Sequence, residues 1–260
     1  MNVNFDELKA CGFNRQRQPN YFSLRLKFIG GHITAEQLDT IQRVAEKFGK
    51  GYVHLTTQQG IEIPFIHLDD VDAVKKILST NFKLGAKVRT ITACQGNSVC
   101  PSGLIDTQKL ALEFDKRYGG RELPRKFKFG ITGCPNNCLK VEKNDVGVKG
   151  GVKPIWHSER CNFCGACQAV CPKKIITVDK TAKKFLLAES RCVHCGKCIK
   201  KCPTNSLRGQ IGFTVFIGGE NFLPIIFDEQ QLYEIVDAAL NFFETNAKSG
   251  ERHDKNSQSL

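Results

Sequence analysis

The sequence lacks the features that mark membrane and secreted proteins. None of its apolar runs approaches the length that crosses a bilayer. Its first residues, Met-Asn-Val-Asn-Phe-Asp-Glu, contain neither the basic segment nor the apolar segment of a secretion signal. These absences argue against a spanning helix and predict a cytoplasmic protein. The 260 residues suffice for one large domain or two modest ones with a real core.

Cysteine is scarce outside a few closely spaced groups. Of the thirteen cysteines, only Cys11 stands alone, and the other twelve fall at spacings typical of metal ligands. In a small secreted chain so many thiols would indicate disulfides, whereas without a secretion signal they indicate metal centres. Cys11 is expected to be an ordinary buried or surface thiol.

Two close cysteine pairs lie in the middle of the chain, Cys94 with Cys100 and Cys134 with Cys138. Each pair lies on a loop that contains Gly, Pro or Asn, so the four thiols can turn inward toward one soft-metal centre. A 4Fe-4S cluster suits them, because gaps of five and three residues differ from the two-residue gaps usual in zinc sites. A structural zinc site or unrelated buried thiols remain the alternative.

The other eight cysteines form an internal repeat in which the last thiol of each run precedes a proline. The first run is Cys161, Cys164, Cys167 and Cys171, and the second is Cys192, Cys195, Cys198 and Cys202. This is the run of bacterial two-cluster ferredoxins, whose fourth cysteine ligates the other cluster. One cluster is therefore assigned to Cys161, Cys164, Cys167 and Cys202, and the other to Cys171, Cys192, Cys195 and Cys198. His194 is expected to be a surface residue, because four thiolates already complete its site.

Periodicity before the first cysteine pair predicts a small α+β domain over residues 15–82. Apolar and polar residues alternate over 21–29, as in a half-buried strand. Thr34 and Gln37 form a capping box before a helix, and a second helix follows two aspartates at 69–70. The expected apolar positions of these helices are Leu38, Ile41, Val44, Ala45 and Phe48, then Val71, Val74, Ile77 and Leu78. Two strands near 52–56 and 60–65 complete the order strand, helix, strand, strand, helix.

The rest of the chain is expected to form a second α+β domain with an insertion. We expect strands at 87–93, 123–129 and 211–217, a helix at 106–117 capped by Asp106, and a final helix at 228–245. The predicted boundaries are 83–152 and 209–246 for this domain, 153–208 for the inserted ferredoxin domain and 247–260 for a disordered tail.

Residues 133–138, Gly-Cys-Pro-Asn-Asn-Cys, together with the pair at 94 and 100 and with Asn-Asp-Val-Gly at 144–147, resemble the sirohaem-binding half of sulfite and nitrite reductases. In that family the four cysteines hold a 4Fe-4S cluster and the last one also bridges to the sirohaem iron, which here implies Cys138. The resemblance covers about residues 15–245 and, with the insert, is greatest to the C subunits of anaerobic sulfite reductases. It implies sirohaem and three 4Fe-4S clusters.

The resemblance also implies substrate and cofactor contacts. The segment 123–129 is similar to the one that supplies the paired catalytic lysines, here Lys126 and Lys128, which a strand would project to one face. Arg89 stands where the family places a substrate-site arginine. The implied cofactor contacts are Thr57, Gln58, Gln95, Gly96, Asn97, Arg125, Asn136, Asn137 and Cys138.

Two segments depart from the family pattern. Residues 54–62 match a segment usually written Leu-Thr-Thr-Arg-Gln, but Gln58 replaces the arginine. Glutamine carries no charge, so weaker anion binding or another substrate preference is expected. Residues 220–224 are one residue shorter than the usual loop and lack its basic pair, which leaves the contacts expected from that loop in question.

The resemblance implies an enzyme that reduces sulfite to sulfide with six electrons, fed through the ferredoxin insert. One alternative keeps the chemistry and changes the substrate to nitrite, which would yield ammonia. The other is a non-catalytic electron-transfer subunit of such a complex. Many relatives place the cofactor between two such halves, whereas this chain has one. A homodimer, or a complex with ferredoxin or other electron-donor subunits, is therefore expected.

The positive charge of the chain does not require a nucleic-acid partner. Lysine and arginine exceed aspartate and glutamate by twelve. Three clusters would bring a charge of about −6 and the sirohaem carboxylates about −8, so the holoprotein would be close to neutral. No recognised nucleic-acid-binding module is present. The basic residues are therefore explained by the cofactors.

Overall fold

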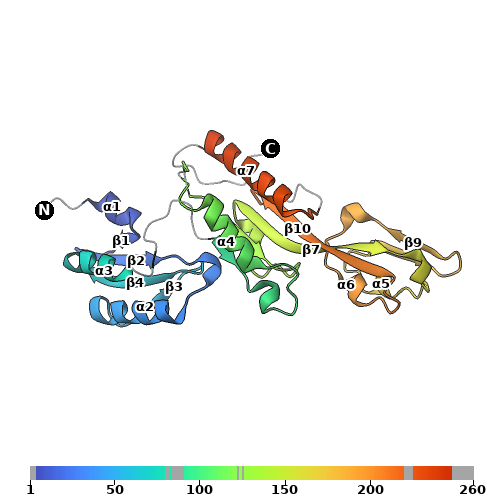
Figure 1. Ribbon diagram of the computed structural model, residues 1–260, viewed down its shortest axis with the longest axis horizontal. Helices are drawn as coiled ribbons and strands as arrows, with labels where there is room; N and C mark the ends of the chain where they lie inside the picture. The colour runs from blue at the N-terminus through green and yellow to red at the C-terminus, as the bar shows by residue number, and fades with distance from the viewer. Residues whose placement is uncertain are drawn as a thin grey trace. The chain divides into compact units, whose positions relative to one another are not determined.

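The computed structural model describes residues 4–79, 82, 91–121, 123–124, 126–219 and 225–247 (Figure 1). These residues form two compact units. Unit 1 contains the described residues of Met1–Ala93, Gln108–Phe129 and Phe242–Leu260, and unit 2 those of Cys94–Thr107 and Gly130–Asn241. Among the described helices, none is both long and apolar enough to span a membrane.

The N-terminal part of unit 1 is a four-stranded antiparallel sheet with helices. Its elements are α1 (Phe5–Ala10), β1 (Phe13–Arg15), β2 (Tyr21–Leu26), α2 (Ala35–Phe48), β3 (His54–Leu55), β4 (Ile61–His67) and α3 (Val71–Leu78). The strand order is β1-β2-β4-β3, and every pairing is antiparallel. The predicted order of strand, helix, strand, strand and helix is confirmed.

The core of this sheet confirms the predicted periodicity at most positions. Phe22, Leu24 and Leu26 of β2 are buried while Arg25 is exposed. The predicted capping box at the start of α2 is present, with both reciprocal hydrogen bonds. The buried cluster also includes residues upstream of position 15, at Leu8 and in β1.

Two apolar residues assigned to helix faces were predicted wrongly. Leu38 on α2 is 50% exposed, and Ile77 on α3 is 38% exposed. The packed face of each helix is narrower than the sequence pattern suggested, because only part of its circumference meets the sheet. Neither side chain supports a docking role, since single exposed apolar residues are normal.

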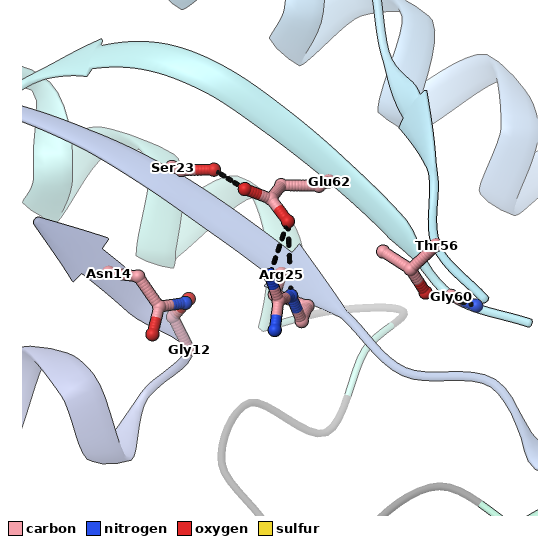
Figure 2. Close-up of polar contacts among 7 residues, drawn as sticks. All are labelled: Gly12, Asn14, Ser23, Arg25, Thr56, Gly60 and Glu62. Atoms are coloured by element: carbon pink, nitrogen blue, oxygen red, sulfur yellow. Dashed lines mark hydrogen bonds and ion pairs between the residues drawn. The ribbon is translucent and has the colours of Figure 1, made fainter. Parts of the chain in front are cut away.

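Glu62 on β4 is held between two residues of β2 (Figure 2). One of its carboxylate oxygens accepts a hydrogen bond from Ser23 Oγ, and the other accepts from Arg25 Nε at 3.1 Å and Nη2 at 2.6 Å. Burial by itself would raise the pKa of Glu62, but these donors and the charge of Arg25 outweigh it and lower that pKa. The fold therefore stabilises the ionised carboxylate.

Glu62→Gln is expected to lower the free energy of unfolding by about 1 kcal/mol at pH 7. Because the folded-state pKa is lowered, the contribution is present above the unfolded-state pKa and disappears as the pH falls through the folded value. Urea unfolding of the holoprotein at pH 7 and near pH 4 measures both. Asp39→Asn is the control, because Asp39 is 63% exposed in its pair with Arg43. An equal loss at both pH values would contradict this assignment.

An aromatic cluster fills the remainder of unit 1. It joins α4 (Thr107–Tyr118), the start of β6 (Phe129–Thr132) and the end of α7 (Glu229–Asn246). Phe127 packs edge-on against Phe243 with ring centroids 4.9 Å apart, and Phe129 lies 5.2 Å from Phe114. The helices and the strand predicted here are present, except that β6 begins at Phe129 instead of running through 123–129.

A long two-stranded ribbon organises unit 2. β7 (Val146–Trp156) pairs with β10 (Leu207–Ile217) in antiparallel register along their whole length (Figure 1). Within unit 2, β6 lies beside β7 through residues 130–132, and β5 (Ile91–Ala93) belongs to unit 1. The buried strand predicted at 211–217 is part of β10, although Ile211 is 51% exposed. The residues between Trp156 and Leu207 form the connection at one end of the ribbon.

That connection contains the eight repeated cysteines. Its elements are α5 (Ala166–Ala169), β8 (Ile176–Asp179), β9 (Lys184–Leu187) and α6 (Lys197–Lys200). β8 and β9 form an antiparallel hairpin. A small core holds it together, built from Ile175, Ile176, Cys198 and Leu207, with Trp156, four further cysteines and several apolar side chains packed around them. Thiols thus make up much of the interior of a segment with few large apolar side chains.

Candidate iron–sulfur and substrate site

The backbone of unit 2 brings Cys94 beside the second cysteine pair. Cys94 directly follows β5, and its N–H donates to the carbonyl of Ile131 on β6 at 3.0 Å. The N–H of Gly133 donates to Cys94 Sγ at 3.0 Å, and Gly133 is followed at once by Cys134. The backbone of the second cysteine loop therefore lies against the Cys94 sulfur, and the convergence of all four thiols stays a prediction. Backbone N–H donors to cysteine sulfur are among the contacts that set the potential of a cluster.

Close-packed glycines keep the two loops together. A Cβ added to Gly133 would lie 3.0 Å from Gly96 Cα, and Gly96 itself has a positive φ of 63°. The N–H of Leu104 donates to the carbonyl of Gly133 at 2.7 Å. Side chains at 96 or 133 would push the loops apart. Gly96, predicted as a cofactor contact, is buried and has this structural role.

The loop of the second pair exposes Cys138 and buries Cys134. Cys134 is 7% exposed, whereas Cys138 is exposed. Between them Asn137 has a positive φ of 52°, its Oδ1 accepts from Val141 N–H at 3.1 Å, and its Nδ2 donates to Glu142 at 2.6 Å. The amide of Asn137 therefore shapes the loop. Asn136, Gln95 and Asn97 are exposed.

The second set of repeated cysteines surrounds one cavity. Cys171, Cys192, Cys195 and Cys198 all line it, and the space between the lining residues is about 360 Å³, part of it open solvent. This is the set that the ferredoxin crossover predicts. Burial raises the pKa of Cys198 to about 11, and the neighbouring charges of Cys192 and Cys195 add to the rise. Clustered, desolvated thiols are unfavourable as thiolates until a cation neutralises them, so the donor set suits an iron–sulfur cluster.

The first set is less enclosed. Burial raises the pKa of Cys167, and the charges of Cys161 and Cys164 add to it. Burial opposes ionisation of Cys202 as well, but hydrogen bonds, chiefly from Ser206, bring its pKa to about 7. The buried indole Nε1 of Trp156 has no acceptor among the described residues, although the ring packs in the same core.

Of the three cysteine sets, the one made of Cys171, Cys192, Cys195 and Cys198 lines a common space. Among the described residues, no three His, Cys, Asp or Glu side chains converge on a single-ion site. A 4Fe-4S cluster presents four irons, each of which takes one thiolate, so its ligands surround a volume. All thirteen cysteines are free of disulfides. The residues present are therefore compatible with clusters.

A tight turn at residues 56–60 of unit 1 contacts Ala93, the residue before Cys94. The N–H of Gly60 donates to Thr56 Oγ1 at 3.0 Å and closes the turn (Figure 2). The side-chain amide of Gln59 then pairs with both backbone groups of Ala93, donating to its carbonyl at 2.8 Å and accepting from its N–H at 2.9 Å. This paired contact fastens the turn to the end of β5. Gln59 was not predicted as a site residue, and only a search for glutamines at tight turns could have suggested it.

Gln58, the residue that departs from the family pattern, lies in that turn. Its Oε1 is buried and accepts no hydrogen bond within the described part of the chain. Thr57 beside it is exposed. A buried carbonyl oxygen without a donor is costly, and a bound group with a donor would relieve it.

The predicted catalytic lysines precede β6. Lys126 is exposed and Lys128 is half-buried, while Phe127 and Phe129 are buried at 2% and 0% exposure. Burial alternates as expected of an extended segment, although the strand itself starts at Phe129. Both lysines belong to unit 1 and the cysteines to unit 2. Arg89, Arg125 and the loop 220–224 lie outside the described residues.

The comparisons with known proteins show the family of the chain. The family described as "Nitrite and sulphite reductase 4Fe-4S domain" matches residues 84–257. The chain belongs to the sirohaem sulfite and nitrite reductase family. The family's ferredoxin-like half domain matches residues 14–80, so both predicted parts of a reductase half are accounted for.

Relatives within the reductase family include two sulfite reductases. The chain is 32% identical over 171 residues to the coenzyme F420-dependent sulfite reductase of Methanocaldococcus jannaschii, covering 64% of this chain and 27% of that protein. It is 30% identical over 192 residues to the C subunit of the anaerobic sulfite reductase of Salmonella typhimurium, covering 66% and 56%. The chain thus spans about half or less of these relatives.

The fold of a reductase half is shared with a solved structure. The crystal structure of dissimilatory sulfite reductase I has a TM-score of 0.69 and 20% identity, with 89% of this chain and 65% of that chain covered. At this identity the likeness shows the α+β fold alone. The two-cluster content of the insert stays a prediction.

Proposed function

We propose that the chain is the sirohaem- and cluster-binding subunit of a sulfite reductase that reduces sulfite to sulfide with six electrons. The observation that carries this proposal is the junction of the two cysteine loops, where Gly133 N–H meets Cys94 Sγ at 3.0 Å. It lies within the region that matches the reductase 4Fe-4S domain. The sulfite reductases among the relatives support sulfite as the substrate.

The proposed cofactors are sirohaem and three 4Fe-4S clusters. One cluster is held by Cys94, Cys100, Cys134 and Cys138, and two by the crossed sets of the insert. Bound sirohaem supplies an iron at which the anion is reduced. The exposure of Cys138, unlike that of Cys134, suits a thiolate shared with a group outside the loop.

The remaining site residues are proposed to bind the anion and move protons. Lys126 and Lys128 supply positive charge and transferable protons for oxygen atoms leaving as water. Arg89 adds a third cation, and Arg125 pairs with a cofactor carboxylate. Further polar contacts to the cofactor are proposed for Thr57, Gln58, Gln95, Asn97 and Asn136, with Gly96 and Asn137 shaping the loops.

Partners are proposed because these residues match a single reductase half. A second copy or other subunits would complete the cofactor site, and a ferredoxin or an electron-donor subunit would feed the insert. One relative is named as the C subunit of its enzyme, which supports a multi-subunit complex. We propose the cytoplasm as the location.

An absorption spectrum and an iron count on anaerobically purified protein test this function. We expect sirohaem bands and about thirteen irons per chain. Cluster iron without sirohaem would overturn the catalytic proposal and leave an electron-transfer subunit. Zinc in place of iron would overturn the clusters themselves.

Nitrite is the second candidate substrate, and Gln58 is the residue that favours it, because the expected arginine is missing. Gln58→Arg is expected to change the ratio of kcat/KM for sulfite to that for nitrite by about tenfold, since it adds a charge-assisted contact to the anion. Steady-state kinetics with both anions under anaerobic conditions measures the ratio.

The matched control for this prediction is Gln42→Arg. Replacing Gln42 with arginine adds the same positive charge, but on the exposed side of α2. A similar shift in the control would mean that general electrostatics and not contact causes the effect. An unchanged ratio in Gln58→Arg, with cofactor content intact, would mean that position 58 does not face the substrate.

A further inference from the structure

Three consecutive residues of β7 contact two different cysteine-bearing loops. Gly150 lies against the loop that carries Cys134, because a Cβ at 150 would collide with the carbonyl oxygen of Gly133. Val152, two residues on, forms a parallel bridge with Cys195 of the insert. The backbone of β7 therefore passes directly from one predicted cluster site to another.

A hydrogen bond and close packing hold β7 against the loop of the insert. Val152 N–H donates to the carbonyl of His194 at 2.9 Å. A Cβ at Gly151 would lie 3.1 Å from His194 Cβ, and a Cβ at Gly196 would lie 2.5 Å from Val152 Cγ1. His194 was predicted as a surface residue, but it is half-buried against the strand. Glycines at 151 and 196 allow the strand and the insert loop to approach this closely.

The first cysteine set is attached farther along the ribbon. Its member Cys202 contacts Ser206, whose carbonyl accepts from His157 N–H at 2.7 Å, just beyond the end of β7. A strand rises about 3.3 Å per residue, so Trp156 at that end lies about 13 Å beyond Val152. Cys164 of this set is exposed. A Cβ at Gly165 would meet only Lys180 Cε, at 4.0 Å.

We infer that the two insert clusters act in a fixed order. The set of Cys161, Cys164, Cys167 and Cys202, which contains the exposed Cys164, receives electrons, and the set of Cys171, Cys192, Cys195 and Cys198, which contains the buried Cys198, passes them across Gly150–Val152 to the Cys94 loop. This inference rests on the proposed function, because it needs clusters at all three sets.

Each transfer in this order moves one electron. An external one-electron donor protein is oxidised as it reduces the cluster of the Cys164 set. That cluster is reoxidised as it reduces the second one, which in turn reduces the cluster of the Cys94 loop. No bond forms or breaks, and no proton is needed. Six such passages supply one sulfite reduction.

Magnetic coupling between reduced clusters tests the order independently of turnover. Holoprotein reduced anaerobically with dithionite is examined by electron paramagnetic resonance. In Cys164→Ala, which removes a ligand of the first cysteine set, the spin–spin splitting between the second cluster and the Cys94-loop cluster should persist. In Cys195→Ala, that splitting should be lost, and the Cys94-loop cluster should give the spectrum of an isolated cluster.

Gly151→Val tests the crossing while keeping every cysteine. The larger side chain would push the His194 segment away from β7, so we expect weaker splitting and slower reduction of the Cys94-loop cluster after rapid mixing with the reductant. Ile211→Val is the control. Ile211 pairs with Val152 across the ribbon, but its side chain is 51% exposed.

The outcomes separate this inference from the function on which it rests. Loss of the splitting in Cys164→Ala, but not in Cys195→Ala, would reverse the order and overturn the inference with the enzyme intact. Equal splitting in Gly151→Val and Ile211→Val would overturn the crossing at Gly150–Val152. An insert without iron in the wild-type protein would overturn the cluster proposal and the inference together.

Discussion

Replacing Cys138 with serine is expected to abolish sulfite reduction while the two insert clusters stay in place. Cys138 is the exposed member of its set, and the family resemblance makes it the thiolate shared between cluster and sirohaem. Serine is a poor ligand for both because its hydroxyl stays protonated, so the direct link between the two groups would be lost. We expect the rate to fall to background.

Anaerobic assays with a reduced dye as electron donor measure that rate, and the absorption spectrum reports the sirohaem. Cys11→Ser is the matched control, because Cys11 belongs to none of the three sets and packs at the edge of the unit 1 core. It should leave rate and iron content unchanged. Turnover near the wild-type rate in Cys138→Ser would show that another residue makes the link.

Gly103→Ala is expected to remove the cluster of the Cys94 loop. A Cβ at 103 would lie 2.5 Å from the backbone nitrogen of Asn97 and from the backbone of Gly96. These are backbone atoms of the loop between Cys94 and Cys100, so no side chain can rotate away. We expect a loss of about four irons per chain and of about 3 kcal/mol in the free energy of unfolding, near the upper end for overpacking.

Iron analysis and urea unfolding of the purified holoprotein measure the two losses. Gly120→Ala is the control because Gly120 has a φ of +81° with nothing within 4 Å of an added Cβ. Alanine there costs about 1 kcal/mol of local strain, with no loss of iron. Full iron content in Gly103→Ala would mean that the loop can shift without losing its cluster.

Short-range signals made much of the fold predictable. The alternation over 21–29, the capping box at Thr34 and Gln37 and the helix near 228–245 each depend on residues within a turn or two of one another. The misassigned positions, Leu38 and Ile77, depend on which part of a helix surface meets the sheet. That is a tertiary property, and a local pattern cannot show it.

The spacing of the cysteines predicted which thiols belong together. The crossed set of Cys171, Cys192, Cys195 and Cys198 lines one cavity, as the ferredoxin pattern indicated. Spacing groups neighbouring ligands because short loops restrict where they can point, whereas the assignment of Cys171 to the second run comes from the crossover of the ferredoxin pattern. It carries none about how distant sets lie relative to one another.

By itself the sequence determined the family and the α+β class, because motif spacing and periodicity can be read from neighbouring residues, and it predicted the three sets of thiols. Only the tertiary structure decided that Gln59 is paired to Ala93, that Gly150 lies against Gly133 and that Val152 meets Cys195. These contacts join residues between 17 and 43 positions apart. They depend on how strands and loops pack. The local sequence around these glycines and this glutamine does not distinguish them from others in the chain.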